Sequence, residues 1–249
     1  MITIGIANQK GGVGKTTISF NLAHILSIKK RVLAIDNDPQ GNLTKSFLED
    51  PDSLSGNIFA AYSDDNPTPQ PITSKLDLLG ANQKLAEVVD MDFENIYKLQ
   101  DVKDRFDQKY DFCIIDSPPS LDRLQLAVLS AADYIIIPVK PAPYSLQGMT
   151  DLFNIIKKIK KRVNQNLEIL GILINQADGR NLILEREMEE TLRETYDGLV
   201  FKTKLHKRTA VEQSPALQKP ITEHAPKNPS TAEFKRLAKE ITTRIRRAK

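Results

Sequence analysis

The chain has 249 residues, of which 40% are hydrophobic and 27% charged, and its formal net charge is +3. These values are ordinary for a globular protein, and the length suffices for one well-buried core. No stretch approaches the roughly 18 consecutive apolar residues of a membrane-spanning helix, and the single cysteine, Cys113, excludes an internal disulfide. The chain opens on an apolar run without a basic leader, which is unlike a signal peptide. We therefore expect a cytoplasmic protein that forms one domain over residues 1–249.

The charge is unevenly distributed along the chain. Residues 201–249 carry 13 Lys and Arg against 4 Asp and Glu, a net charge of +9, and the rest of the chain has a net charge of −6. A basic segment on an acidic body favours a polyanionic partner at that end. A solvated basic helix would give the same composition, so charge alone leaves both interpretations open.

Short apolar runs rich in β-branched residues alternate with longer segments of helical period. We predict strands at residues 3–7, 31–35, 76–79, 112–115, 134–139 and 167–174, and helices at residues 16–27, 82–89, 92–108, 120–131, 145–162, 182–196 and 231–247. The runs are almost continuously apolar, as expected of parallel strands covered on both faces. The alternation predicts right-handed crossovers and a three-layer α/β sandwich, with helices on both faces of a mostly parallel twisted sheet.

Two proline-rich stretches interrupt this alternation. Residues 50–74 contain four prolines and predict a surface excursion with one short helix at residues 58–62. Residues 214–230 contain four more, and because proline does not fit inside a helix we predict an extended loop there. Ser230 is then the expected N-cap of the last helix.

A glycine-rich segment lies between the first strand and the first helix and closes with Gly14-Lys15-Thr16. Glycines allow backbone N–H groups to turn inward around phosphates, and the helix N-terminus adds partial positive charge. A lysine here reaches the β- and γ-phosphates, and a threonine hydroxyl binds Mg²⁺. The sequence therefore predicts a nucleotide site formed by Lys10, Gly11, Gly12, Val13, Gly14, Lys15, Thr16 and Thr17.

Four segments together resemble the ParA/MinD family. Residues 10–17, Lys-Gly-Gly-Val-Gly-Lys-Thr-Thr, resemble its deviant Walker A motif, and residues 31–42 are similar to its switch I. Residues 112–120 look like its Walker B strand and switch II, and residues 215–226 resemble the proline-rich loop of the ParA/Soj branch. The resemblance covers essentially the whole chain and implies a P-loop NTPase fold, ATPase activity, and ATP and Mg²⁺ as cofactors.

Three aspartates are candidates for the metal and the chemistry. Asp36 and Asp116 each end an apolar strand, where ligands bind in open α/β sheets, and carboxylates there can hold Mg²⁺. By resemblance, Asp38 positions or deprotonates the attacking water, although a helix cap or an Asx-turn would also explain it. By resemblance too, Lys10 reaches across a dimer interface to the partner's phosphates, so the catalytic set is Lys10, Lys15 and Asp38.

Recognition of the base is predicted from two places. Asn175 follows the last predicted strand and is placed to meet adenine. The ParA/Soj branch often has Pro-Arg-Asn before its proline-rich loop, whereas this chain has His206, Lys207 and Arg208. His206 and Arg208 could still stack on the base, but the departure weakens the expectation of adenine contacts from this loop.

Partners are predicted from the resemblance and from the basic C-terminal fifth. Relatives bind DNA without sequence preference as ATP-bound dimers, are stimulated by a ParB-like protein, and associate with the nucleoid. Candidate phosphate contacts are Lys202, Lys204, Lys207, Lys227, Lys235 and Arg236. Two alternatives remain: an ATPase of the same type that positions a protein assembly, and a MinD-like protein whose last helix binds a membrane.

Overall fold

The computed structural model describes the chain except residues 64, 142–146, 179–181 and 249. Seven strands form one sheet in the order β3-β4-β2-β5-β1-β6-β7. All neighbouring pairs are parallel except β3 and β4, which are antiparallel. The strands are β1 (Ile2–Ile6), β2 (Val32–Asp36), β3 (Gln70–Thr73), β4 (Leu76–Leu79), β5 (Phe112–Asp116), β6 (Tyr134–Val139) and β7 (Glu168–Ile174).

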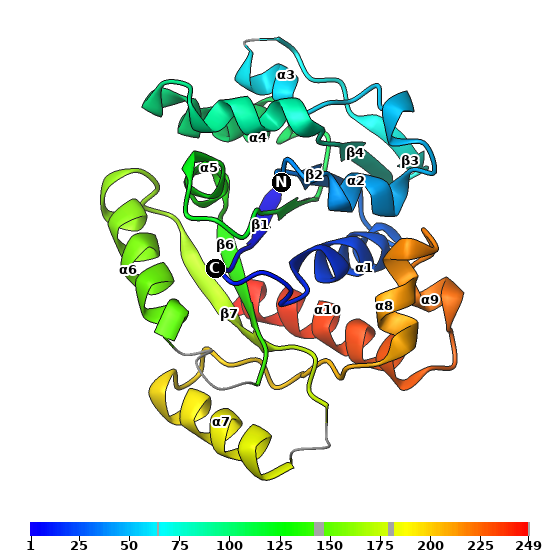
Figure 1. Cartoon of the computed structure of the whole chain (residues 1–249), viewed down its shortest axis with the longest axis vertical. Helices are drawn as coiled ribbons and strands as arrows, with labels where there is room; N and C mark the ends of the chain where they lie inside the picture. The colour runs from blue at the N-terminus through cyan, green and yellow to red at the C-terminus, as the bar shows by residue number, and fades with distance from the viewer. Residues whose placement is uncertain (64, 142–146, 179–181, 249) are drawn as a thin grey trace.

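Helices cover both faces of the sheet (Figure 1). On one face are α1 (Lys15–Ser27), α2 (Asn42–Phe47), α8 (Thr209–Ala216), α9 (Ile221–His224) and α10 (Pro229–Ala248). On the other are α4 (Lys98–Phe106), α5 (Arg123–Ala131) and α6 (Gln147–Arg162). The remaining elements are α3 (Phe59–Tyr62), α7 (Leu182–Thr195) and the 3-10 turns η1 (Pro51–Ser53), η2 (Gln83–Val89) and η3 (Phe93–Tyr97).

Alternation along the buried strands explains this three-layer arrangement. In β2, Val32 and Ala34 pack toward α1 and α10, whereas Leu33 and Ile35 pack toward α4 and α5. Because successive side chains of a strand point to opposite faces, an all-apolar strand needs a helical layer on each side. The predicted α/β fold is therefore confirmed, with all six predicted strands present.

One strand was missed in the proline-rich stretch at residues 50–74. The short antiparallel strand β3 lies inside the stretch predicted as a surface excursion, and it alternates partly buried with exposed residues around Pro71. Proline is tolerated at a sheet edge, where its missing N–H has no ladder partner to lose. The helices predicted at residues 82–89 and 92–108 are present, the first as the 3-10 helix η2 and the second as the 3-10 helix η3 followed by α4.

The stretch 214–230 is not an extended loop. Pro215 lies near the C-terminal end of α8, and α9 follows Pro220. A proline this late in a short helix loses little, because its missing N–H removes one intrahelical bond and α8 ends one residue later. Ser230 lies inside α10 rather than before it, and its backbone N–H donates to the side chain of Asn228 at 3.0 Å.

The last helix is part of the core. Phe234, Leu237, Ile241 and Ile245 of α10 are buried against α1 and the sheet. Within the described residues, no helix is long and apolar enough to cross a membrane.

After α7, the chain returns along the outer edge of β7. Ile172 exchanges backbone hydrogen bonds with this segment, donating to Leu199 at 3.0 Å and accepting from Phe201 at 2.9 Å. Further along, residue 205 donates to the carbonyl of residue 174 at 3.0 Å, and residue 177 donates back to residue 205 at 3.1 Å. The edge of β7 is thus paired with residues 199–205 without a regular eighth strand.

Candidate nucleotide site

The phosphate loop connects β1 to α1 at the carboxyl edge of the sheet. Gly12 and Gly14 have φ angles of +69° and +89°, a region that costs an ordinary side chain free energy and that glycine enters freely. The loop therefore needs glycine at these two positions. This agrees with the predicted strand-loop-helix context, since β1 ends at Ile6 and α1 begins at Lys15.

Lys15 points into the loop rather than into solvent. Its side chain is buried, and its ammonium donates to the carbonyl of Asn8 at 3.0 Å and to that of Lys10 at 3.5 Å. Burial lowers the pKa of Lys15 below its usual value, and the negative charges of Asp116 and Asp38 oppose this shift. The ammonium thus lies at the centre of the loop, where a bound phosphate would meet it.

Asp116, the last residue of β5, is fully buried and accepts two hydroxyl groups from α1. Thr16 donates to its Oδ2 at 2.7 Å, and Ser19 donates to its Oδ1 at 2.9 Å. Burial raises the pKa of Asp116 to about 7, and the neighbouring charge of Asp36 adds to this. Ser19 was not predicted to contact Asp116. Its position three residues after Thr16 could have indicated this contact, because residues at that spacing lie on the same face of a helix.

Asp36 ends β2, the strand beside β5, and is also fully buried. Its Oδ2 accepts the backbone N–H and the hydroxyl of Thr44, both at 2.8 Å. Burial raises the pKa of Asp36 to about 6, while the hydrogen bonds from Thr44 and Asp38 lower it. Thr44 is a second residue missed in the sequence, because nothing in residues 42–47 announces a contact back to the strand.

Asp38 lies just beyond the strand and is buried, with 7% of the residue exposed. Its Oδ1 accepts the N–H of Gln40 at 2.9 Å, and its carbonyl accepts the N–H of Gly41 at 2.9 Å. The Asx-turn considered from the sequence is therefore present. Such a turn fixes the orientation of the carboxylate and does not conflict with a role toward water.

The donor set fits a magnesium ion that is shared with phosphate. Within the described residues, no three His, Cys, Asp or Glu side chains form a metal cage. Mg²⁺ is commonly held by one or two carboxylates together with phosphate oxygens and water. Thr16 and Asp116 are in contact, and the charge of Asp36 acts on Asp116, so these three predicted ligands lie together.

Two further lysines lie on the outer side of the loop. Lys10 is exposed, and its backbone N–H donates to the side chain of Asn8 at 2.9 Å. Lys140, which follows β6, places its ammonium 3.9 Å from where a β-carbon on Gly12 would lie. Lys140 was not among the predicted residues, because the sequence alone does not place the end of β6 beside the loop.

Asn175 and its neighbour Gln176 contact the loop directly. Asn175 donates from Nδ2 to the carbonyl of Val13 at 2.7 Å, and Gln176 donates from Nε2 to the carbonyl of Gly12 at 3.2 Å. The position of Asn175 at the end of β7 is as predicted, but here its amide is bonded to the phosphate loop. A contact with adenine stays a prediction.

His206 and Arg208 converge on one buried carboxylate of α10. His206 places its Nδ1 2.8 Å from Oε1 of Glu233, and Arg208 donates to both oxygens of Glu233 at 2.8 and 2.9 Å. Arg208 also donates to the hydroxyl of Ser230 at 3.0 Å. These contacts anchor the segment before α8 to the last helix, and stacking of either side chain on a base remains a prediction.

The predicted DNA contacts are divided by the fold. Lys202 and Arg236 line one groove of about 810 Å³, together with the basic side chains of Lys239, Arg244 and Arg247. Lys204 instead forms an ion pair with Glu189 of α7 at 2.9 Å. The other three predicted contacts, Lys207, Lys227 and Lys235, are exposed.

This groove, which we call the basic groove, lies far from the phosphate loop. Its lining includes Tyr134 and Glu168, which are the first residues of β6 and β7. Since β1 and β6 are parallel, the loop at the carboxyl end of β1 and the groove lie at opposite edges of the sheet.

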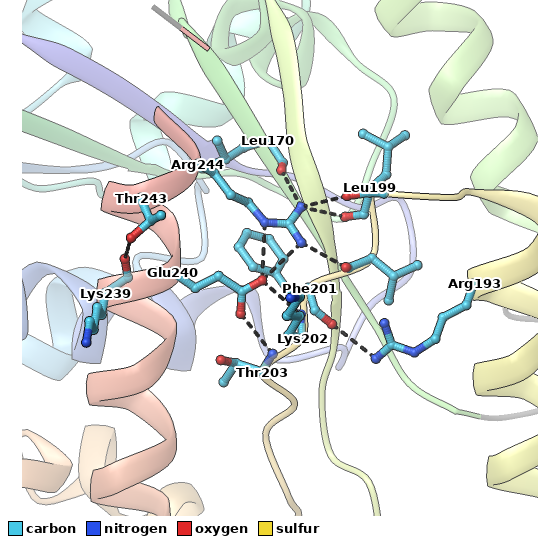
Figure 2. A network of polar contacts seen from close by, with 12 residues as sticks. Leu170, Arg193, Leu199, Phe201, Lys202, Thr203, Lys239, Glu240, Thr243 and Arg244 are labelled. Carbon is cyan, nitrogen blue, oxygen red and sulfur yellow. Dashed lines mark hydrogen bonds and ion pairs between the residues drawn. The ribbon is translucent and has the colours of Figure 1, made fainter. Parts of the chain in front are cut away.

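Arg244 fixes the wall of the basic groove (Figure 2). Its guanidinium donates to the carbonyls of Leu170, Leu199 and Val200 at 2.8–3.0 Å and lies 4.2 Å from the ring centre of Phe201. An ion pair of 3.0 Å joins it to Glu240 one turn earlier on α10. The same carboxylate accepts the backbone N–H groups of residues 202 and 203 at 2.8 and 2.9 Å.

Comparisons with known proteins agree with the predicted family and fold. A family model described as an AAA domain matches residues 1–169. The chromosome-partitioning ATPase Soj of Thermus thermophilus is 33% identical over 258 aligned positions, which cover 98% of this chain and 97% of that protein. The sporulation initiation inhibitor protein Soj of Bacillus subtilis is 34% identical over 254 aligned positions, covering 96% and 97%.

Solved structures show the same architecture. Cobyrinic acid a,c-diamide synthase from Mycobacterium smegmatis, with bound ATP analog and magnesium, has a TM-score of 0.83 at 28% identity, covering 96% of this chain and 93% of that one. The expected cofactors, ATP and Mg²⁺, agree with the contents of that structure. McdA from Cyanothece shares the fold, with a TM-score of 0.87 at 21% identity and coverage of 98% and 99%.

The identity to both Soj proteins extends over nearly the whole length of each chain. The four segments singled out in the sequence lie in this aligned range, and the two that form the phosphate loop and the Asp116 strand are adjacent in space. The chain therefore belongs to the ParA/Soj family of partition ATPases.

Proposed function

We propose that this protein hydrolyses ATP to ADP and phosphate with Mg²⁺ and that it serves the partition of plasmid or chromosomal DNA. One observation carries the proposal: Lys15, Thr16 and Asp116 meet in a buried site at the carboxyl edge of the sheet, with Asp36 and Asp38 beside them. Burying the charged groups of Lys15, Asp36, Asp38 and Asp116 so close together costs free energy, and such clusters are typical of sites that serve a charged ligand.

Each residue has a distinct role in this proposal. Lys15 and the inward N–H groups of the loop bind the polyphosphate, and Thr16 and Asp116 would hold the Mg²⁺, which would supply positive charge against the phosphates. Asp38 orients the attacking water and accepts its proton through Oδ2, because Oδ1 is already bonded to Gln40.

Lys10 supports a dimer as the active form. Its side chain is exposed, while its backbone is fixed by Asn8. We propose that it reaches the phosphates of a partner copy and adds positive charge where the transferred phosphoryl group becomes more negative. Hydrolysis then requires two nucleotide-bound copies.

The basic groove supports DNA as the polyanion. Arg236, Lys239 and Arg247 lie at intervals of three and eight residues, so they fall along one stripe of α10. No aromatic side chain accompanies them on that helix stripe, and such a surface suits phosphate contacts rather than base readout. We propose that the ATP-bound dimer binds double-stranded DNA nonspecifically, on the nucleoid in the cytoplasm, and that a ParB-like partner releases it by stimulating hydrolysis.

The MinD-like alternative conflicts with the packing of α10. Its apolar stripe, which includes Phe234, Leu237 and Ile241, is buried in the core rather than available for a lipid surface. Positioning of a protein assembly instead of DNA would use the same ATPase site, and the two differ in the partner that stimulates hydrolysis.

The decisive experiment measures ATPase rate and DNA binding together. We expect ATP hydrolysis to require Mg²⁺. The protein should bind nonspecific duplex DNA with a nonhydrolysable ATP analogue but not with ADP, and its affinity for the DNA should fall steeply as the salt concentration rises. A parallel sedimentation with anionic liposomes tests the membrane alternative. A protein that hydrolyses ATP but ignores DNA at every salt concentration would retain the ATPase proposal and refute the DNA one.

A further inference from the structure

Two consecutive residues after β7 bond to two consecutive carbonyl groups of the phosphate loop. The side-chain amide of Asn175 donates to Val13 at 2.7 Å and that of Gln176 to Gly12 at 3.2 Å. The backbone N–H of Asn175 donates to Val139 of β6 at 2.8 Å, so the donor is itself attached to the sheet. The loop is therefore tied to the carboxyl ends of β6 and β7.

The sequence of the loop leaves room for this contact. A β-carbon on Gly14 would lie 2.3 Å from Nδ2 of Asn175 and 3.4 Å from Nε2 of Gln176. Gly14 is thus required for the close approach of the Asn175 amide as well as for its own positive φ angle.

Gln176 makes its bond from a strained backbone. Its φ angle is +59°, in the left-handed region that residues with a β-carbon rarely occupy. The backbone on either side of it is fixed, because Asn175 donates to Val139 at 2.8 Å and Ala177 donates to Leu205 at 3.1 Å. The bond to Gly12 is the contact that the strained geometry makes possible.

We propose that Asn175 and Gln176 are positioning residues for the phosphate loop and that they act on the polyphosphate rather than on the base. The peptide unit is rigid and trans, so its carbonyl and its N–H point in opposite directions. Holding the carbonyl of Gly12 outward directs the N–H of Val13 inward, and holding that of Val13 does the same for the N–H of Gly14. The inference rests on the proposed function, since it requires a nucleotide in this loop.

The test replaces Gln176 with methionine, which has nearly the same size and no donor. The probes are MgATP, MgGTP and magnesium tripolyphosphate, each titrated by calorimetry. We expect the affinity for all three to fall by a similar factor, about three- to tenfold for one lost neutral hydrogen bond, while the ATP-to-GTP ratio stays constant. The melting temperature without nucleotide should change little, because the side chain is not part of the core.

Two further variants keep the test specific. Gln218 has a φ angle of +55° and donates to the carbonyls of Lys45 and Leu48 at 3.1 and 2.8 Å, away from the loop. Gln218→Met is therefore the matched control and should bind all three probes as the wild type does. Gln176→Gly removes the donor and relieves the strain, so it should lose affinity as Gln176→Met does without losing stability.

The outcomes separate this inference from the proposed function. Wild-type protein that binds none of the probes overturns both. Wild-type protein that binds them with the same affinity as Gln176→Met overturns the positioning role alone. A loss confined to MgATP, with GTP and tripolyphosphate unaffected, would assign this segment to adenine recognition instead.

Discussion

Thr16 and Asp116, both predicted to bind Mg²⁺, are bonded directly to each other, with 2.7 Å between the Thr16 hydroxyl oxygen and Oδ2 of Asp116. They come from different elements, the first turn of α1 and the last residue of β5, which the parallel sheet brings to one edge. Two potential oxygen ligands in contact define a small site in which a cation would be shared with phosphate.

Asp116→Asn should remove the benefit that Mg²⁺ gives to nucleotide binding. The amide keeps the size of the side chain but lacks the charge that attracts a divalent cation. We expect the affinity for ATP in EDTA to change little, whereas the increase in affinity on adding Mg²⁺ should fall at least tenfold. A fluorescent ATP analogue measures both affinities. Asp111, just before the same strand, is an acidic control, and Asp111→Asn should keep the Mg²⁺ effect. An Asp116→Asn protein with a full Mg²⁺ effect would remove Asp116 from the metal site.

Lys10→Ala should separate nucleotide binding from dimer formation. Lys10 is exposed on the loop and contributes no side-chain contact to the core, so the variant should fold and bind ATP. Without the amine that we assign to the partner's phosphates, it should remain monomeric with ATP and Mg²⁺ and should not hydrolyse. Light scattering after size exclusion measures this, with Lys84→Ala, an exposed lysine of η2, as control. A dimer of Lys10→Ala that forms only with ATP would defeat the role.

The basic groove should dominate the salt dependence of DNA binding. Each phosphate contact that is removed lowers the slope of log affinity against log salt by roughly one unit. Lys202→Gln with Arg236→Gln should therefore lower the slope by roughly two units, measured by fluorescence anisotropy in the presence of a nonhydrolysable ATP analogue. Lys84→Gln with Lys109→Gln removes the same charge elsewhere and should leave the slope unchanged. Lys207→Ala with Lys227→Ala tests the two exposed candidates outside the groove in the same assay.

His24 should make the fold sensitive to acid. Its ring packs against Phe20 and Phe47 at centroid distances of 4.8 and 5.3 Å, and burial lowers the pKa of His24 to about 4. Because the unfolded chain binds a proton near pH 6.5 and the folded one does not, stability is complete above that pH and declines as the pH falls toward 4. Between pH 8 and pH 5 the free energy of unfolding should drop by about 2 kcal/mol from this residue.

Urea unfolding of wild type and His24→Phe at the two pH values measures the effect of the histidine. The phenylalanine variant keeps an aromatic ring in the cluster and cannot be protonated, so its stability should depend less on pH by that amount. Equal pH dependence in both proteins would show that His24 gains a proton without disturbing its neighbours.

Arg244→Lys should destabilise the protein although it preserves the charge. Lysine cannot reproduce the planar fork that serves four backbone carbonyl groups and Glu240 at once, so carbonyls in a partly buried network lose their donor. The expected loss is about 2 kcal/mol in the free energy of unfolding, measured in urea. Arg246→Lys, on the exposed face of the same helix, should be neutral. An unchanged free energy of unfolding in Arg244→Lys would mean that Phe201 and the buried apolar stripe hold α10 in place without this network.

The parts that the sequence predicted well are those set by local rules. Continuous apolar runs located six strands, and the glycine-lysine-threonine segment located the phosphate loop, because both depend on neighbouring residues. The edge strand β3 was missed because Pro71 and exposed residues obscure its pattern. Pro215 misled the interpretation of α8 because a short helix tolerates proline near an end.

Contacts between distant segments explain the remaining differences. Thr44 bonds to Asp36, Gln176 to the phosphate loop, and Arg208 to Glu233. Each pair depends on the register and crossing of elements that composition does not fix. For the same reason the predicted DNA contacts could be recognised as basic but not sorted into those that line the groove and those that do not.

The pairing along the outer edge of β7 limits how copies of this protein can assemble. Residues 199–205 occupy donors and acceptors that an open edge strand would offer to a neighbouring chain, and Arg244 takes the carbonyl of Leu170. A second molecule cannot extend the sheet at this side without first displacing that segment. Association between copies at this border must therefore use side chains and loops, and it cannot grow as a continuous ribbon of strands.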